Sequence, residues 1–171
     1  DRATYIAFTP TGTPHSTLVA VDFNQQASFS ADSLSAKVQI DSSPLPEWAL
    51  YPAGVMSSLM AAGLTAPSMN AVFASDVPRG SGLSSSASVE MAFALAWQTL
   101  GKWTRSPMER ALLGQRAENK YVGVNCGIMD QFISVHGEAD HALLLDCRSL
   151  AYRLVPLPSQ SIGIVVCNTM V

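Results

Sequence analysis

Residues 78–88, PRGSGLSSSAS, place two glycines and three consecutive serines directly before a segment with the pattern of a long helix. Gly80 and Gly82 can adopt a positive φ angle and let a ligand approach the backbone closely. The N-terminus of the following helix offers free backbone N–H groups at the positive end of the helix dipole, and the serines add hydroxyls there. The stretch therefore predicts an anion-binding loop, with a chain of phosphates as the expected anion.

This loop differs from the common phosphate motifs. The sequence has no G-x-x-x-x-G-K-[ST], and Ser85 stands where G-x-G-x-x-G has its third glycine. A plain Gly/Ser turn before a helix is the alternative interpretation. The whole eleven-residue string, however, resembles the central ATP-binding motif of the GHMP kinases, and its triple serine is similar to the galactokinases among them. The resemblance implies that the ATP phosphates contact Gly80, Ser81, Gly82, Leu83, Ser84, Ser85 and Ser86.

The composition is typical of a soluble enzyme. Of the 171 residues 48% are hydrophobic and 13% are charged, which is too apolar for a disordered chain. The net charge of −3 and the absence of a Lys/Arg cluster argue against a nucleic-acid partner. No apolar run approaches the length of a membrane span. Cys126, Cys147 and Cys167 show no metal-like spacing, so we expect reduced thiols and a cytoplasmic location.

Hydrophobic periodicity predicts an α+β fold, with strands first, then helices, then strands. The expected strands are Thr4–Thr9, Ser16–Asp22, Ala36–Asp41, Asn70–Ser75, Ala142–Asp146, Tyr152–Leu157 and Gly163–Asn168. The expected helices are Glu47–Ala62, which Gly63 would end, Ser85–Leu100, a helix from Pro107 to about Lys120, and Gly127–His136. Ser106 and Glu109 have the spacing of a capping box at the start of the third helix.

A second motif, QRAENKYVGVNCGIMDQFIS at residues 115–134, also resembles galactokinases. The resemblance implies that Glu118 holds the Mg²⁺ that accompanies ATP, with Ser86 as a second metal contact and Ser85 as the neighbour that could share its role. Mg²⁺ prefers oxygen ligands and needs only one or two from the protein. From the residues alone, the favoured interpretation of Glu118 is a solvated helix carboxylate paired with Arg116 or Lys120, and only the resemblance favours the metal site.

The same motif supplies the expected sugar site. The resemblance implies that Asp130 is the catalytic base and faces the sugar, with Cys126 and Gly127 beside it. Asp130 also stands at a predicted helix start, which stabilises its ionised form. Its apolar neighbours favour a partly buried position, whereas the alternative is a merely structural helix-start carboxylate. Cys126 is expected to line the pocket rather than act as a nucleophile, because it has no local His partner.

Two aromatic residues precede the loop by about one helix and one strand. The resemblance implies that Trp48 and Tyr51 lie beside the adenine of ATP. Core packing explains aromatic residues at helical spacing equally well, so both interpretations stay open here.

Together these residues predict that positions 1–171 form part of a GHMP kinase N-terminal, ATP-binding domain. Its fold would resemble ribosomal protein S5 domain 2, a mixed sheet packed with helices. The family's N-terminal sugar motif and C-terminal Gly-rich motif, and with them the C-terminal domain, are missing from the sequence. We therefore expect a central fragment that is inactive alone.

The resemblance implies ATP-dependent phosphorylation of galactose at its anomeric hydroxyl, by a protein that is monomeric at full length. Another sugar kinase of the family, acting on N-acetylgalactosamine or arabinose, is one alternative. A non-enzymatic sugar sensor is the other. The intact serine loop and Asp130 favour the enzyme.

Overall fold

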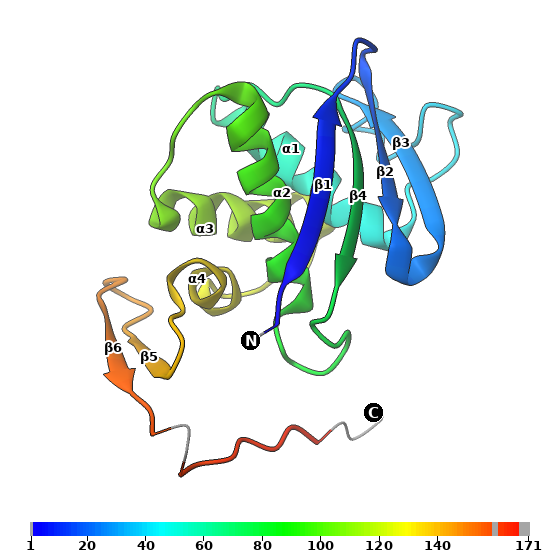
Figure 1. Ribbon diagram of the computed structural model, residues 1–171. Coiled ribbons are helices and arrows are strands. Elements are labelled where there is room, and N and C mark those ends of the chain that lie inside the picture. The colour runs from blue at the N-terminus through cyan, green and yellow to red at the C-terminus, as the bar shows by residue number, and fades with distance from the viewer. Residues whose placement is uncertain (1, 159–160, 168–171) are drawn as a thin grey trace.

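The computed structural model describes residues 2–158 and 161–167. Four strands form its main sheet: β1 (Thr4–Pro10), β2 (His15–Ala20), β3 (Gln25–Ser30) and β4 (Met69–Ser75). They lie in the order β1-β4-β2-β3 (Figure 1). β2 pairs parallel with β4, and the two outer pairings are antiparallel, so the sheet is mixed as predicted.

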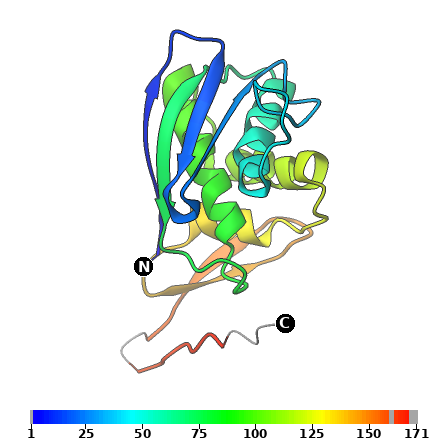
Figure 2. The same cartoon turned by 90° about the vertical axis from the view of Figure 1, so that its right-hand side faces the viewer.

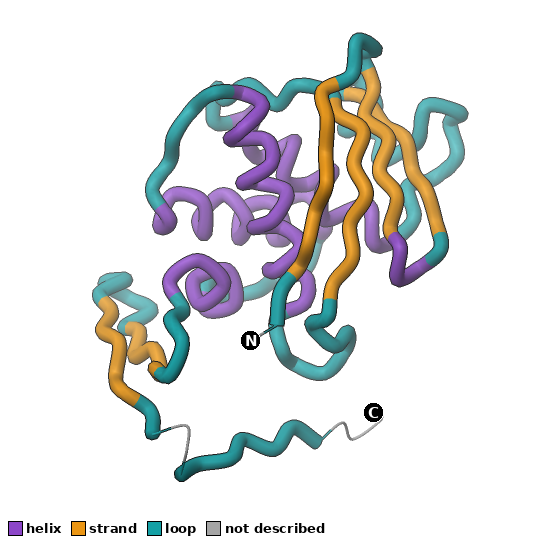
Figure 3. The backbone as a smooth tube through the Cα atoms, in the orientation of Figure 1, coloured by secondary structure: helices purple, strands orange, loops and turns teal. Residues whose placement is uncertain are grey.

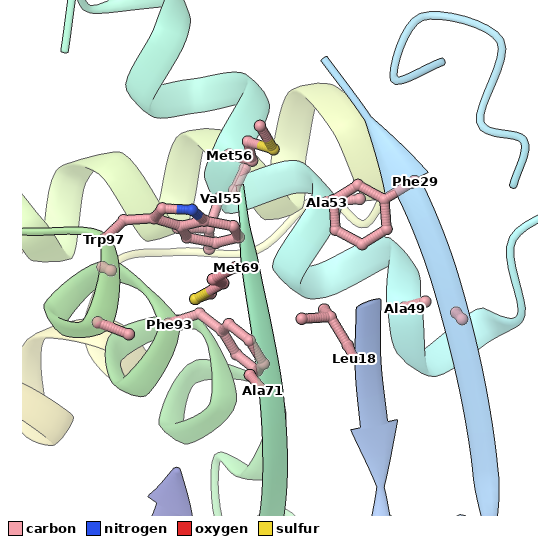
Figure 4. Close-up of a cluster of buried hydrophobic side chains, with 14 of the residues drawn as sticks. Leu18, Phe29, Ala49, Ala53, Val55, Met56, Met69, Ala71, Phe93 and Trp97 are labelled. Carbon is pink, nitrogen blue, oxygen red and sulfur yellow. The ribbon is translucent and has the colours of Figure 1, made fainter. Parts of the chain in front are cut away.

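Helices cover one face of this sheet (Figure 2). Side chains alternate in burial along β2 and β4, where Leu18 and Phe73 are buried and Val72 is exposed. Such alternation is typical of a sheet with one solvated face. Helices α1 (Glu47–Ala61) and α2 (Ser85–Gly101) contribute the other half of the core, in which Phe93 and Trp97 pack beside Met69 (Figure 4).

Two helix ends follow their local sequence. Beyond α1, Gly63 adopts φ +72°, and the N–H of Leu64 donates to the Leu59 carbonyl, which is the Schellman arrangement. Helix α3 (Pro107–Arg116) begins with the predicted capping box. The Ser106 hydroxyl accepts from the Glu109 N–H, and the Glu109 carboxylate accepts from the Ser106 N–H.

The third helix was expected to continue as an α-helix to about Lys120, but its α-helical part ends at Arg116. After Arg116 the chain continues as a π-helix, η2 (Ala117–Val122), which ends at Gly123 with φ +96°. π-Helical turns are rare and frequently occur at functional sites. Helix α4 (Met129–His136) follows, and then a separate antiparallel hairpin of β5 (His141–Leu145) and β6 (Tyr152–Pro156) (Figure 3).

Two predicted strands are wrong. Residues 36–41 form turns, because Lys37 takes φ 54°, which an extended strand does not allow. This segment instead lies along the edge of β3, where the Ile40 N–H donates to the Ser28 carbonyl. Strand β3 itself was not predicted from the sequence. Residues 163–167 are not extended into a strand, and Asn168 lies outside the described residues.

No helix within residues 2–158 and 161–167 combines the length and apolar character needed to cross a membrane.

Candidate functional site

A cavity of about 940 Å³ lies between the start of α1, the sheet and the loop of residues 78–88. Five of the predicted site residues line it: Trp48, Tyr51, Gly80, Ser85 and Ser86. The structure thus brings the expected adenine-side residues and part of the phosphate loop to one place. The other loop residues named from the sequence do not line this cavity, namely Ser81, Gly82, Leu83 and Ser84.

The loop has the backbone geometry expected of it. Gly80 and Gly82 adopt φ +63° and +70°, and an added Cβ at either would find no described atom within 4 Å. Backbone conformation, not crowding, is therefore what requires glycine there. Ser84 adopts φ 60° immediately before α2, and no side chain of the described residues caps this helix end. Its first-turn N–H groups are free of a side-chain partner, which suits an anion.

Trp48 packs in the core, as one of the two interpretations predicts, and its place beside the adenine stays a prediction. Its ring is 7% exposed and packs against Phe73, with centroids 5.7 Å apart, and its indole N–H donates to Gln25 Oε1 at 2.7 Å. The same residue lines the cavity. Tyr51 is half-buried beside it, and burial raises the pKa of its phenol, helped by the Glu118 charge.

Two side chains that were not among the predicted site residues complete this wall of the cavity. Phe23 stacks on Trp48 at 6.3 Å between centroids, and the Arg79 guanidinium lies 4.1 Å above the Phe23 ring. Arg79 stands next to Gly80 and could have been found by its place in the loop. Phe23 could not, because only the sheet topology brings residue 23 to residue 79.

Glu118 reaches the phosphate loop from the π-helix. Its Oε1 accepts a hydrogen bond from the Ser86 hydroxyl at 3.4 Å, although 32 positions separate the two residues. Glu118 is only 6% exposed, and within the described residues neither Arg116 nor Lys120 pairs with it. The solvated-carboxylate interpretation is therefore wrong. A hydroxyl and a carboxylate oxygen this close form a donor set that fits Mg²⁺.

The second oxygen of Glu118 belongs to a buried polar cluster. Glu118 Oε2 accepts from Gln131 Nε2 at 2.7 Å and from the Cys126 thiol at 3.4 Å. Burial, followed by the bond to Glu118, raises the pKa of Cys126 to about 11. A thiol with that pKa stays protonated near neutral pH, which agrees with the rejection of Cys126 as a nucleophile.

Gln131 also contacts Glu90, a residue that sequence reasoning did not single out. Glu90 is fully buried on α2, and its Oε2 accepts from Gln131 Nε2 at 2.9 Å. Burial raises the pKa of this carboxyl to about 9. A signal was available, since Glu90 follows Ala87 by three positions and precedes Ala94 and Trp97 at helical spacing, in an otherwise apolar stripe.

Asp130 stands in the first turn of α4, as predicted, and is half-buried. Among the described residues no side chain or backbone group bonds to its carboxylate, which leaves that carboxylate available to a ligand. The next residue, Gln131, is the one that joins Glu118. Asp130 is therefore the neighbour in sequence of the residue whose side chain bonds to Glu118.

The loop before α4 carries the other two expected sugar contacts. Asn119 of η2 holds Cys126 at both ends of its backbone: Oδ1 accepts from the N–H at 2.8 Å and Nδ2 donates to the carbonyl at 3.2 Å. Gly127 is exposed, and a Cβ there would meet no described atom within 4 Å. Asn119 is thus a further residue that shapes this site.

Residues 51–138 match the family described as GHMP kinases N terminal domain. The chain belongs to the GHMP kinase family. The match spans α2, the π-helix and α4, so every element that carries Ser86, Glu118 and Asp130 lies within it.

Known relatives of this GHMP kinase cover nearly all of the chain. The galactokinase of Roseiflexus sp. (strain RS-1) is 47% identical over 169 residues, which is 99% of this chain and 41% of the relative. The galactokinase of Chloroflexus aggregans (strain MD-66 / DSM 9485) is 42% identical over 99% of this chain and 42% of its own length. The chain thus spans about two-fifths of the curated relatives it matches.

Solved structures bear out the predicted fold class. The Lactococcus lactis galactokinase complexed with galactose superposes with a TM-score of 0.81 at 30% identity, covering 91% of this chain and 39% of that one. The Methanococcus jannaschii mevalonate kinase gives a TM-score of 0.64 at 17% identity, over 80% of this chain and 42% of the other, which is a likeness of fold.

Proposed function

We propose that this chain supplies the nucleotide-binding part of a galactokinase, which transfers the γ-phosphate of ATP to the anomeric hydroxyl of galactose. The observation that carries the proposal is the position of Ser86. This residue lines the cavity that contains Trp48 and Tyr51, and it also bonds to Glu118. One side chain therefore links the expected nucleotide pocket to Glu118, which Gln131 joins in turn to the helix that carries Asp130. The galactokinase names of relatives at 42–47% identity support galactose as the acceptor.

Phosphoryl transfer depends mainly on positioning the reactants and stabilising the charge of the phosphate. In this proposal the backbone of residues 80–86 and the serine hydroxyls hold the phosphates, while Trp48 and Tyr51 lie beside the adenine. Cys126 and Gly127 contact the sugar. The Asp130 carboxylate orients the acceptor hydroxyl and takes its proton.

The residues present also fit a divalent cation. In this proposal Ser86 and Glu118 hold Mg²⁺, which would neutralise charge on the transferring phosphate when it is bound. The support is the 3.4 Å contact between their oxygens and the burial of Glu118. Because Mg²⁺ usually keeps several waters and substrate oxygens, two protein ligands are sufficient.

The remaining expectations belong to the same proposal. The chain would be part of an N-terminal, ATP-binding domain, with further sugar contacts and a C-terminal domain in the rest of a protein of the relatives' length. That protein would be a cytoplasmic monomer, with ATP and galactose as its partners and neither nucleic acid nor membrane. The acidic net charge of −3 supports the expectation that nucleic acid is not a partner.

The test is turnover by the full-length protein that carries this chain. With ATP, Mg²⁺ and galactose, we expect ADP release and a product identified by mass spectrometry as galactose 1-phosphate. The Asp130→Asn protein serves as the control for contaminating kinases.

Two outcomes would contradict the proposal in different ways. Turnover with N-acetylgalactosamine or arabinose but not galactose would assign another acceptor. Binding of ATP and galactose without any turnover would point to a sugar sensor.

A further inference from the structure

One amide nitrogen joins two buried carboxyl groups in this structure. Gln131 Nε2, on α4, lies 2.9 Å from Glu90 Oε2 on α2 and 2.7 Å from Glu118 Oε2 on the π-helix. Gln131 and Glu90 are both 0% exposed, and Glu118 is 6% exposed. Side chains from three elements therefore meet at a single donor atom, with Glu90 41 positions and Glu118 13 positions from Gln131.

The chemistry of the amide fixes its orientation. The Gln131 nitrogen carries two hydrogens, and the two carboxyl oxygens each accept one. If the amide were flipped, its oxygen would face Glu118 Oε2 without a hydrogen between them, and Glu118 would lose this donor. Gln131 is consequently held on one side by Glu90 and holds Glu118 on the other.

This arrangement divides the two oxygens of Glu118 between different tasks. Oε2 is occupied by Gln131 and by the Cys126 thiol, whereas Oε1 is directed to Ser86 in the phosphate loop. A free glutamate side chain would rotate about its last bond and change the direction in which both oxygens point. The bonds at Oε2 restrict that rotation, so that Oε1 is directed to Ser86 before any ligand arrives.

The cluster is costly to bury, and the surrounding chain makes room for it. Among the described residues Glu90 Oε1 and Gln131 Oε1 have no hydrogen-bond partner, so the pair is not optimised for stability alone. Gly114 on α3 faces both side chains. A Cβ there would lie 3.1 Å from Gln131 Cγ and 3.2 Å from Glu90 Oε2. The fold thus accommodates two incompletely paired polar side chains in its interior.

We propose that Gln131, anchored by Glu90, is a positioning residue that aims Glu118 Oε1 at Ser86 and the phosphate loop, and so pre-organises the cation site. The inference rests on the proposed function, because it assigns a role within that metal site. Residues that orient a metal ligand affect metal affinity by about 10–100-fold when they are removed. Gln131 acts on the metal only through Glu118.

The experiment measures Mn²⁺ binding by electron paramagnetic resonance, with a non-hydrolysable ATP analogue and the full-length protein. Gln131→Met keeps the length of the side chain and removes both donors. We expect it to weaken Mn²⁺ binding by about 10–100-fold. At saturating Mg²⁺, kcat should fall much less than the Mg²⁺ affinity does, since the reacting groups remain.

Variants of Glu90 test the anchor separately and remain informative if Gln131→Met does not fold. Glu90→Gln retains an acceptor oxygen for the Gln131 amide and should keep Mn²⁺ affinity near that of the unsubstituted protein. Glu90→Met removes the acceptor and should weaken the affinity. Phe93→Leu, on the same helix but facing the sheet, controls for a general loss of stability, and we expect it to leave Mn²⁺ binding unchanged.

Equal Mn²⁺ affinity in Gln131→Met, Glu90→Met and the unsubstituted protein would overturn the positioning role and leave the proposed function intact. An unsubstituted protein that binds the ATP analogue but no Mn²⁺ would overturn the metal site itself, and the positioning role with it.

Discussion

Helix α2 is buried on two sides, and the two sides differ in chemistry. Toward the sheet, Phe93 packs edge-on against Phe73, with ring centroids 5.2 Å apart. Its ring also contacts that of Trp97 on the same helix, tilted and with centroids 5.7 Å apart. The one polar atom of Trp97 is satisfied, because its indole N–H donates to the Pro67 carbonyl at 3.1 Å. On the side that faces α3 and α4, Glu90 is equally buried, but it shares its hydrogen-bond donor, Gln131 Nε2, with Glu118.

The two sides of α2 therefore differ in what they contribute, one to stability and the other to the chemistry of the site. Aromatic side chains on the sheet side remove apolar surface from water, which favours folding. Carboxyl groups on the opposite side lose hydration, and only specific partners offset that cost. We infer that the sheet side of α2 maintains the fold, whereas the opposite side prepares the site. Substitutions on the two sides should therefore change different measurements.

The largest effect is expected at Asp130, close to the polar side. Asp130→Asn keeps the shape of the side chain and removes its charge, so kcat of the full-length protein should fall by roughly 10²–10⁴-fold. The melting temperature should change little, because no described group bonds to this carboxylate. Steady-state kinetics and thermal unfolding of the same protein check both points. A lower melting temperature with normal turnover would make Asp130 a structural residue and break the comparison.

On the sheet side, Phe93→Ala should cost roughly 3–5 kcal/mol of unfolding free energy, because it leaves a cavity among fully buried rings. Urea unfolding monitored by Trp fluorescence measures the loss. Leu95→Ala is the matched control, since Leu95 lies on the same helix and is 51% exposed. We expect the control to change stability by less than about 0.5 kcal/mol. Equal effects of the two substitutions would show that the sheet side does not dominate stability.

The pH dependence of stability sharpens the comparison at Glu90. Its pKa rises from 4.5 to about 9 on folding, because burial disfavours the charged form and the Glu118 and Asp130 charges add to the effect, against the bond from Gln131. The stability that neutral Glu90 contributes is complete below pH 4.5 and is lost as the pH rises toward 9. Glu90→Gln is neutral throughout. Its stability relative to the unsubstituted protein should rise by roughly 1 kcal/mol per pH unit between pH 5 and 8.

Thermal unfolding of both proteins over that pH range is the measurement for Glu90. A constant difference between them would mean that Glu90 has the same pKa in the folded and unfolded chains.

The smallest effect concerns the cysteine of the polar cluster. Burial holds the pKa of Cys126 at about 11, so little reactive thiolate forms at neutral pH. We expect iodoacetamide to modify the exposed Cys147 at least about tenfold faster than Cys126, as followed by mass spectrometry of peptides. Glu118→Gln should narrow the gap, because the carboxylate next to the thiol also raises its pKa. Faster labelling of Cys126 would indicate that the cluster is open to solvent.

Much of the local structure could be predicted from the sequence, because it depends on residues that are close together in the chain. The capping box of Ser106 and Glu109 and the positive φ of Gly63, Gly80 and Gly82 were all foreseeable on this basis. The error at residues 36–41 has a tertiary cause. These residues have the composition of a strand, but they form turns along the edge of β3, where the Ile40 N–H donates to the Ser28 carbonyl. That contact exists only in the assembled sheet.

The sequence by itself determined which chemical groups are available: the glycines and serines of the phosphate loop, the two carboxylates Glu118 and Asp130 of the second motif, and the helices that carry them. Their arrangement was decided by tertiary structure. Packing of α2 against α4, and of both α2 and the π-helix against α1 and α3, brings Ser86 to Glu118 across 32 positions and Glu90 to Gln131 across 41. Backbone preferences act over a few residues, whereas a contact across dozens of residues exists only after the helices have packed. The apolar stripe around Glu90 hints at its burial, but its bond to Gln131, and with it the whole polar cluster, had to be seen in the folded chain.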